Sequence, residues 1–122
     1  MKITIKATNL ELTPAIQEYA EKKVGTLEKF FRANSETILA AIELGVTTNH
    51  HKSGDIFRAE LNLSDSASSE QFYAEAEKDD MYAAIDEMKD KAERECLSLK
   101  DKKQSLIKRG AARLKGILRA RG

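Results

Sequence analysis

Three consecutive stretches of this chain alternate apolar and polar residues, and this alternation constrains the fold more than any other feature. The stretches are 37–46 (TILAAIELGV), 55–64 (DIFRAELNLS) and 70–76 (EQFYAEA). In the first, Ile38, Ile42 and Leu44 share one side, as the period of two of a strand requires. The polar connectors, 47–54 and 64–70, consist of turn-forming residues. The pattern predicts an antiparallel meander with one buried face and one solvated face.

A strand and a helix are expected before the meander. Residues 2–8 (KITIKAT) alternate in the same way and predict a strand. From Pro14 to Phe31 the apolar residues recur at helical spacing, which predicts one amphipathic helix. Thr13 is the expected N-cap, and Pro14 stands at the first helical position, where its missing N–H costs nothing.

The longest periodic segment, 77–108, predicts a second helix after the meander. Asp79 or Asp80 is expected to cap it, because negative charge suits the positive end of the helix dipole. Gly110, which follows this segment, is the only obvious weak point before the end of the chain. The expected inner stripe is Met81, Ile85, Met88, Ala92, Cys96, Leu99 and Leu106.

The element order predicts an α+β fold, β-α-β-β-β-α, with two helices packed on one face of a four-stranded sheet. A strand–helix–strand crossover makes the first two strands parallel if they are neighbours. This arrangement resembles a double-stranded RNA-binding domain with an added N-terminal strand. At 122 residues the chain has the size of one domain. We expect the domain to span 1–104 and a basic C-terminal extension to span 105–122.

Charge is divided unevenly along the chain. Residues 1–101 carry 13 basic and 20 acidic side chains, whereas the remainder carries eight basic ones and no acid. Such asymmetry points to contact with nucleic acid or with an anionic membrane. A solvated tail is the other interpretation of the same charges.

Both predicted helices gather cations on one flank. On the first helix these are Lys22 and Lys29, with Lys23 at the apolar edge. On the second helix they are Lys91, Arg94, Lys102 and Arg109. Ordinary helical ion pairs, Glu87–Lys91 and Asp90–Arg94, would account for part of this pattern. If the helices lie side by side, we expect the two flanks to meet in one groove that suits a phosphate backbone.

Two stretches resemble a known family. LTPAIQEYAEKKVGTLEKFF at 12–31 and DMYAAIDEMKDKAER at 80–94 are similar to the ribosome hibernation-promoting factor family, which includes protein Y, and the resemblance covers about 1–103. It implies the same βαβββα fold and binding to 16S-type rRNA of the small ribosomal subunit, in the channel for mRNA and tRNA. Occupancy of that channel would block initiation and hold idle ribosomes inactive.

The resemblance also implies which residues face RNA. It carries the family's basic positions onto Lys23, Lys91, Arg94, Lys100 and Lys102. The helical-face argument adds Lys22, Lys29, Arg32 and Arg109. Whether the chain promotes or opposes ribosome dimers stays open, as does the part played by 105–122. Off the ribosome we expect a monomer.

Other classes of function find little support in the residues. No nucleophile–base pair, phosphate loop or metal motif is present, so we expect no enzyme, no cofactor and no small-molecule substrate. A single cysteine, Cys96, fits a buried thiol in a reducing compartment, and with no apolar segment long enough for a span, the cytoplasm is expected. We expect a loop tip at His50, His51 and Lys52, and it is either solvated or in contact with RNA. Metal binding is a third possibility, but the spacing of the neighbouring residues offers it the least support.

Two alternatives to ribosome binding remain. A regulatory adaptor would bind a protein partner through the open face of the sheet. Attachment to an anionic membrane would use an apolar side of the tail made of Leu106, Leu114, Ile117 and Leu118. Gly110 and Gly116 interrupt that side, so no membrane partner is expected.

Overall fold

The computed structural model of the chain describes residues 1–31, 35–48, 54–68 and 70–121, and beyond Lys102 it describes the backbone. Arg32, His50, His51 and Lys52 therefore lie outside the described residues, and the side chain of Arg109 is not described. The elements follow the predicted order. They are β1 (Lys2–Thr8), α1 (Pro14–Gly25), η1 (Thr26–Phe30), η2 (Ser35–Thr37), β2 (Ile38–Thr48), β3 (Asp55–Asp65), β4 (Gln71–Lys78) and α2 (Met81–Arg121).

The four strands form one sheet in the order β1-β2-β3-β4. β1 runs parallel to β2, with Lys2 opposite Leu39, and the other pairs are antiparallel, with Ile42 opposite Leu61 and Leu61 opposite Ala74. Since the side-chain period is two, this register aligns the apolar positions of neighbouring strands on one face. The predicted α+β fold and meander are confirmed.

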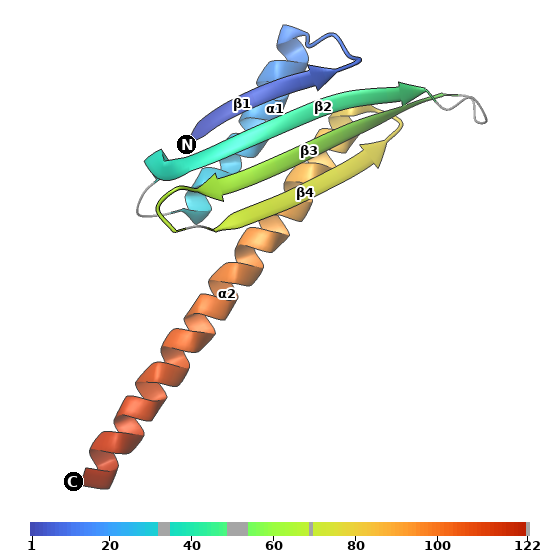
Figure 1. Cartoon of the computed structure of the whole chain (residues 1–122). Coiled ribbons are helices and arrows are strands. Elements are labelled where there is room, and N and C mark those ends of the chain that lie inside the picture. The colour runs from blue at the N-terminus through green and yellow to red at the C-terminus, as the bar shows by residue number, and fades with distance from the viewer. Residues whose placement is uncertain (32–34, 49–53, 69, 122) are drawn as a thin grey trace.

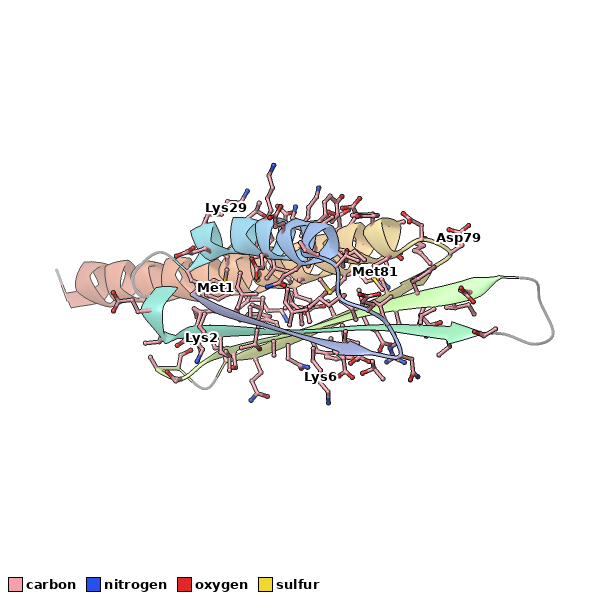
Figure 2. The ribbon with its side chains drawn as sticks, turned by 90° about the horizontal axis from the view of Figure 1, so that it is seen from above. Met1, Lys2, Lys6, Lys29, Asp79 and Met81 are labelled. Atoms are coloured by element: carbon pink, nitrogen blue, oxygen red, sulfur yellow. The ribbon has the colours of Figure 1, made fainter. Side chains whose placement is uncertain are left out.

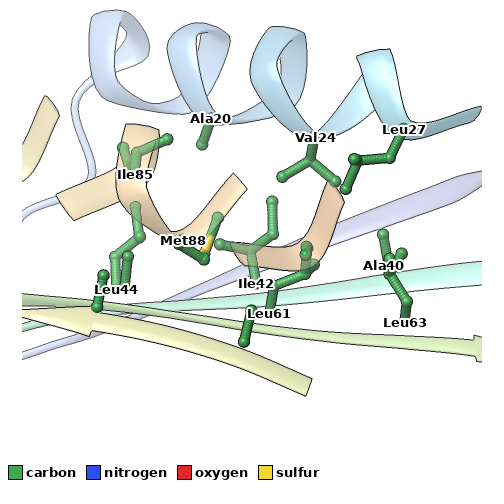
Figure 3. Packing of buried hydrophobic residues seen from close by; sticks show 14 of the residues in the cluster. Ala20, Val24, Leu27, Ala40, Ile42, Leu44, Leu61, Leu63, Ile85 and Met88 are labelled. Atoms are coloured by element: carbon green, nitrogen blue, oxygen red, sulfur yellow. The ribbon is translucent and has the colours of Figure 1, made fainter. Parts of the chain in front are cut away.

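Both helices cover the same face of the sheet (Figure 2). α2 packs against β4 and β3, and α1 packs against β1 and against α2. The core between the layers contains only apolar residues and Cys96 among the described residues (Figure 3). Its largest fully buried side chains are Leu27, Leu44, Leu61, Leu63, Ile85, Met88 and Val24. Burying each such side chain contributes about 1.5–3 kcal/mol.

The predicted helix caps are present. Thr13 Oγ1 accepts a hydrogen bond from the backbone N–H of Ile16 at 3.2 Å, and Pro14 opens α1. At the second helix the cap is Asp80, whose Oδ2 accepts from the backbone N–H of Ala83 at 3.1 Å. Each cap satisfies a donor that the first turn of a helix leaves without an internal partner.

The first helix is shorter than predicted. Its α-helical part ends at Gly25, and Thr26–Phe30 continue as a 3-10 helix. Thr26 Oγ1 donates to the carbonyl of Lys23 at 2.6 Å, and the Thr26 N–H bonds to the same carbonyl, which tightens the turn. Periodicity missed this change because Leu27 stays buried in either winding.

The second helix is longer than predicted and passes through Gly110 without a break. Its 41 residues correspond to about 60 Å at a rise of 1.5 Å per residue. The first part lies under the sheet, whereas the C-terminal part projects beyond the sheet with no other element beside it (Figure 1). α2 thus continues across 104 and 105, and the boundary proposed there stays a prediction.

Candidate nucleic-acid interface

Lys23, on α1, lies at the junction of the two helices. Its Nζ is 3.5 Å from Asp86 Oδ1 and 5.5 Å from the centroid of the Tyr19 ring. The Tyr19 hydroxyl donates to the same Asp86 oxygen at 2.5 Å, and this bond, together with burial and the charge of Asp86, raises the pKa of Tyr19 to about 12. The Tyr19 ring also meets Tyr82 edge-on at 4.9 Å. Lys23 therefore already has partners within the protein, Asp86 and Tyr19, and these contacts join α1 to α2.

Lys22, on α1, and Lys29, on η1, are both exposed. Figure 2 shows Lys29 on the side of the helices that faces away from the sheet. Its Nζ lies 5.3 Å from the centroid of the Phe30 ring. Neither lysine forms an ion pair within the part of the chain that the structure describes. Both ammonium groups are thus accessible to an anion.

Lys91 and Arg94, both exposed, lie on the side of α2 that faces β4. Lys91 Nζ donates to the backbone carbonyl of Glu75 at 2.9 Å, which ties the lysine to the edge strand. Arg94 lines a groove between α2 and β4 and has no ion pair among the described residues.

The two basic flanks do not meet, and the prediction of a single groove between them is wrong. The flank with Lys91 faces β4, at the edge of the sheet remote from α1. The side of α2 that faces α1 instead carries Tyr82 and Asp86. Helical periodicity gives the angle between two sets of side chains on one helix. It does not say which set turns toward a neighbouring helix, and the order of the strands decided that here.

The acids of α2 are paired differently from the prediction. Lys89 Nζ lies 2.7 Å from Glu93 Oε2, and the bond lowers the pKa of Glu93 and raises the pKa of Lys89. Glu87 lies 3.4 Å from Lys78, not against Lys91. The charge of Lys29 also lowers the pKa of Glu93. Neither predicted pair, Glu87–Lys91 or Asp90–Arg94, is among the ion pairs of the described residues.

Lys100 and Lys102 lie where α2 leaves the sheet. Lys100 is half-buried and Lys102 is exposed. With 3.6 residues per turn, Lys102 lies on the same flank of α2 as Lys91, whereas Lys100 lies on the opposite side of the helix. The segment from Lys102 to the end of the chain contains eight basic residues and no acidic one.

The open face of the sheet carries a charge network that the sequence did not reveal. Arg58 pairs with Glu60 at 2.5 Å and also with Glu75 and Glu77. The Tyr73 hydroxyl donates to Glu75 Oε2 at 2.7 Å, a bond that lowers the pKa of the Glu75 carboxyl and raises the pKa of Tyr73. Alternation within each strand placed these residues on the solvated face. The register that sets Arg58 opposite Glu77 was needed to bring them together.

Few of the described residues are candidates for a reactive thiol, a metal site or a membrane span. Cys96 is buried as expected, and burial, with the nearby Glu95 and Glu93, raises the pKa of its thiol to about 11. No group of three His, Cys, Asp or Glu in the described part of the chain has a geometry that would hold a metal ion. None of the described helices has a stretch that is both long and apolar enough to cross a membrane.

Comparison with known proteins finds a matching family and relatives that are named for the ribosome. The family described as sigma 54 modulation protein / S30EA ribosomal protein matches residues 3–104. A protein of Klebsiella oxytoca named ribosome hibernation promoting factor is 35% identical over 103 residues, which cover 84% of this chain and 96% of that one. A ribosome hibernation promotion factor of Lactococcus lactis is 34% identical over 95 residues, which cover 78% of this chain but only 47% of that one.

Solved structures share the fold. The N-terminal domain of Protein Y from Thermus thermophilus superposes with a TM-score of 0.65 at 29% identity and covers 79% of this chain and 96% of that one. A ribosomal subunit interface protein from Coxiella burnetii gives a TM-score of 0.63 at 24% identity, covering 83% and 99%, and supports the fold. The family match ends at residue 104, within α2.

Proposed function

The chain belongs to the sigma 54 modulation protein / S30EA ribosomal protein family, and from that premise we propose that it is a ribosome-associated translation inhibitor. It binds rRNA in the mRNA and tRNA channel of the small subunit and stabilises inactive ribosomes during stress or stationary phase. The observation that carries the proposal is the family match over nearly the whole folded domain, with relatives named ribosome hibernation promoting factors at 35% identity. The names of those relatives also support the cytoplasm as its location.

The proposed inhibitor acts by occupancy rather than by catalysis. A protein that fills the path of mRNA needs affinity for a phosphate backbone, and such affinity comes from cations that release counterions when they meet phosphates. The exposed cations of both helices supply that charge. The proposed rRNA-binding residues are Lys22, Lys23, Lys29, Arg32, Lys91, Arg94, Lys100, Lys102 and Arg109.

These residues are not equivalent in the structure. Lys22, Lys29 and Arg94 have no ion pair within the described residues, so none of them would have to give up a salt bridge to bind an RNA phosphate. Lys23 would have to share its charge with Asp86. Lys91 would keep its bond to the Glu75 carbonyl and offer its remaining N–H groups. We therefore expect Arg94 to contribute more to binding than Lys23.

Sucrose-gradient sedimentation of ribosomes tests the proposal. The full chain should migrate with the small subunit, and the bound amount should fall steeply as salt is raised. Replacing Lys91→Glu and Arg94→Glu together should abolish co-migration. The matched control is Lys2→Glu with Lys6→Glu, because it makes the same charge change on the opposite, open face of the sheet (Figure 2). Normal binding by the α2 variant would sink the assignment of this helix to RNA.

The same gradients address the C-terminal segment. A chain that ends at Lys103 has the length over which the Klebsiella relative matches. If it binds single ribosomes but changes the proportion of ribosome dimers relative to the full chain, residues 104–122 decide between the two states. If it binds more weakly at every salt concentration, the segment adds phosphate contacts instead.

A protein-binding adaptor remains the second candidate, and the open sheet face is the observation that favours it. That face carries Tyr73, which is 50% exposed, and the network around Arg58. An adaptor would keep its partner after nuclease treatment and after the α2 substitutions. A partner captured under both conditions, with no ribosomes bound, would replace the proposal with the adaptor function.

A further inference from the structure

The groove between β4 and α2 combines several features to which the proposed function gives no role. It is an open depression of 370 Å³ lined by Tyr73, Ala74, Glu75, Lys91, Arg94 and Glu95. One wall is the edge strand of the sheet, and the other is the basic flank of α2. The two sides are held together by the hydrogen bond from Lys91 Nζ to the Glu75 carbonyl at 2.9 Å. The shape of the groove is therefore fixed by a direct contact between two elements of the fold.

The cations of this groove are available to an anion. Arg94 is exposed and forms no ion pair within the described residues. A guanidinium offers a planar fork of donors that matches two phosphate oxygens. Lys91 is held in place by one hydrogen bond, so its ammonium has two further N–H groups and loses little freedom when it binds an anion.

The groove also has an aromatic side chain on its rim. Tyr73 is 50% exposed, more than any other large apolar or aromatic side chain of the described residues. Its hydroxyl donates to Glu75 at 2.7 Å, so the side chain is held while half of its surface stays in water. Exposed aromatic rings beside cations are the usual platforms for unstacked bases.

Two carboxylates line the same groove and must be compatible with a ligand. Glu75 is bound by Arg58 and by the Tyr73 hydroxyl, although Arg58 also pairs with Glu60 and Glu77. Glu95 is exposed and has no ion pair in the described part of the chain. A carboxylate repels phosphate but accepts a hydrogen bond from the amino group of a base. A whole nucleotide, with its phosphate at Arg94 and its base toward Tyr73, is therefore a better match for the groove than a free anion.

We propose that the groove between β4 and α2 binds one unstacked nucleotide of the RNA, with its phosphate on Arg94 and Lys91 and its base stacked on Tyr73. The inference rests on the proposed ribosome binding and deepens it. It adds Tyr73, a residue on the sheet, to an interface otherwise built from helical cations. It also makes the contact depend on a base that is free of its neighbours, so double-stranded RNA is not the ligand at this point.

The test is pelleting of purified small ribosomal subunits with the full chain over a range of KCl concentrations. Tyr73→Ala should weaken binding about tenfold without changing the slope of log affinity against log salt, because stacking involves no counterion. Tyr73→Phe keeps the ring and should stay within about twofold of the parent chain. Arg94→Ala should weaken binding and make the slope shallower by about one. Leu39→Ala, an exposed residue on the open face, is the control that should bind like the parent chain.

The outcomes separate the inference from the function on which it rests. If the parent chain and all variants fail to bind subunits, the proposed function is overturned. If Arg94→Ala weakens binding and Tyr73→Ala does not, the nucleotide site is overturned and ribosome binding stands. If Tyr73→Phe is as weak as Tyr73→Ala, the hydroxyl bond to Glu75 matters rather than the ring, and stacking is overturned. Circular dichroism melting of each variant shows that a weak binder is still folded.

Discussion

α2 is one continuous helix, but its two halves are stabilised in different ways. From Met81 to Cys96 the helix buries a stripe of side chains against the sheet, including Ile85 and Met88, which are fully buried. Beyond that stripe it projects from the sheet with no other element beside it (Figure 1). Most helical stability in proteins comes from packing an apolar face rather than from intrinsic propensity. The first half is therefore stabilised by packing against the sheet, whereas the described backbone of the second half has no element of the fold to pack against (Figure 1).

The largest difference in unfolding free energy between the two halves of α2 is expected when a core side chain is truncated. Met88→Ala removes a side chain with no exposed surface and should lower the free energy of unfolding by about 2–5 kcal/mol. Leu97→Ala is the matched control, because this residue is on the same helix and 40% exposed, and should cost less than about 0.5 kcal/mol. Urea unfolding followed by circular dichroism measures both. Equal losses would show that α2 does not pack as described.

A smaller effect is expected where α1 joins the packed half of α2. The Tyr19 hydroxyl donates to Asp86, and a hydrogen bond of this kind contributes about 1 kcal/mol. The folded state raises the pKa of Tyr19 to about 12, above the usual value of 10, so it holds the phenol proton more tightly than the unfolded chain does. The resulting stability is fully present below pH 10 and is lost as the pH rises toward 12.

Tyr19→Phe removes both the bond and its pH dependence. The difference in unfolding free energy between the parent chain and this variant should be constant from pH 7 to 9 and should shrink above pH 10. Leu39→Ala is the control, because this exposed residue on the open face has no ionisable side chain, and its effect should not change with pH. A difference that grows with pH would contradict the assigned hydrogen bond.

The sequence predicted the elements well because each one obeys a local rule. Alternation identified the strands, and helical spacing identified both helices. Residue type alone identified Thr13 as a cap and narrowed the second cap to Asp79 or Asp80, of which the structure shows Asp80. What it missed depends on neighbours that are distant along the chain. The meeting of Arg58 with Glu75 needs the β3–β4 register, and the direction in which Lys91 points needs the position of α2 over β4.

The candidate site was predicted in part for the same reason. The cations of the helices were identified from their helical positions, but whether they act together depends on packing. Lys23 proved to be engaged with Asp86, whereas Arg94 faces a groove beside the edge strand. Tyr73 was assigned to the solvated face, and nothing in the local sequence indicates that this face borders the basic flank of α2 at β4.

The smallest effect, and the one most specific to the projecting half of α2, is expected at Gly110. Glycine lowers helix stability by about 0.5–1 kcal/mol relative to alanine, and a Cβ at this position meets no atom within 4 Å. Gly110→Ala should therefore strengthen the helix locally, with slower amide hydrogen exchange on both sides of residue 110. The global unfolding free energy, set by the packed half, should change by less than about 0.5 kcal/mol. A gain of stability in the whole domain would show that the projecting half is coupled to the core, and the division of α2 into a packed and a projecting half would then fail.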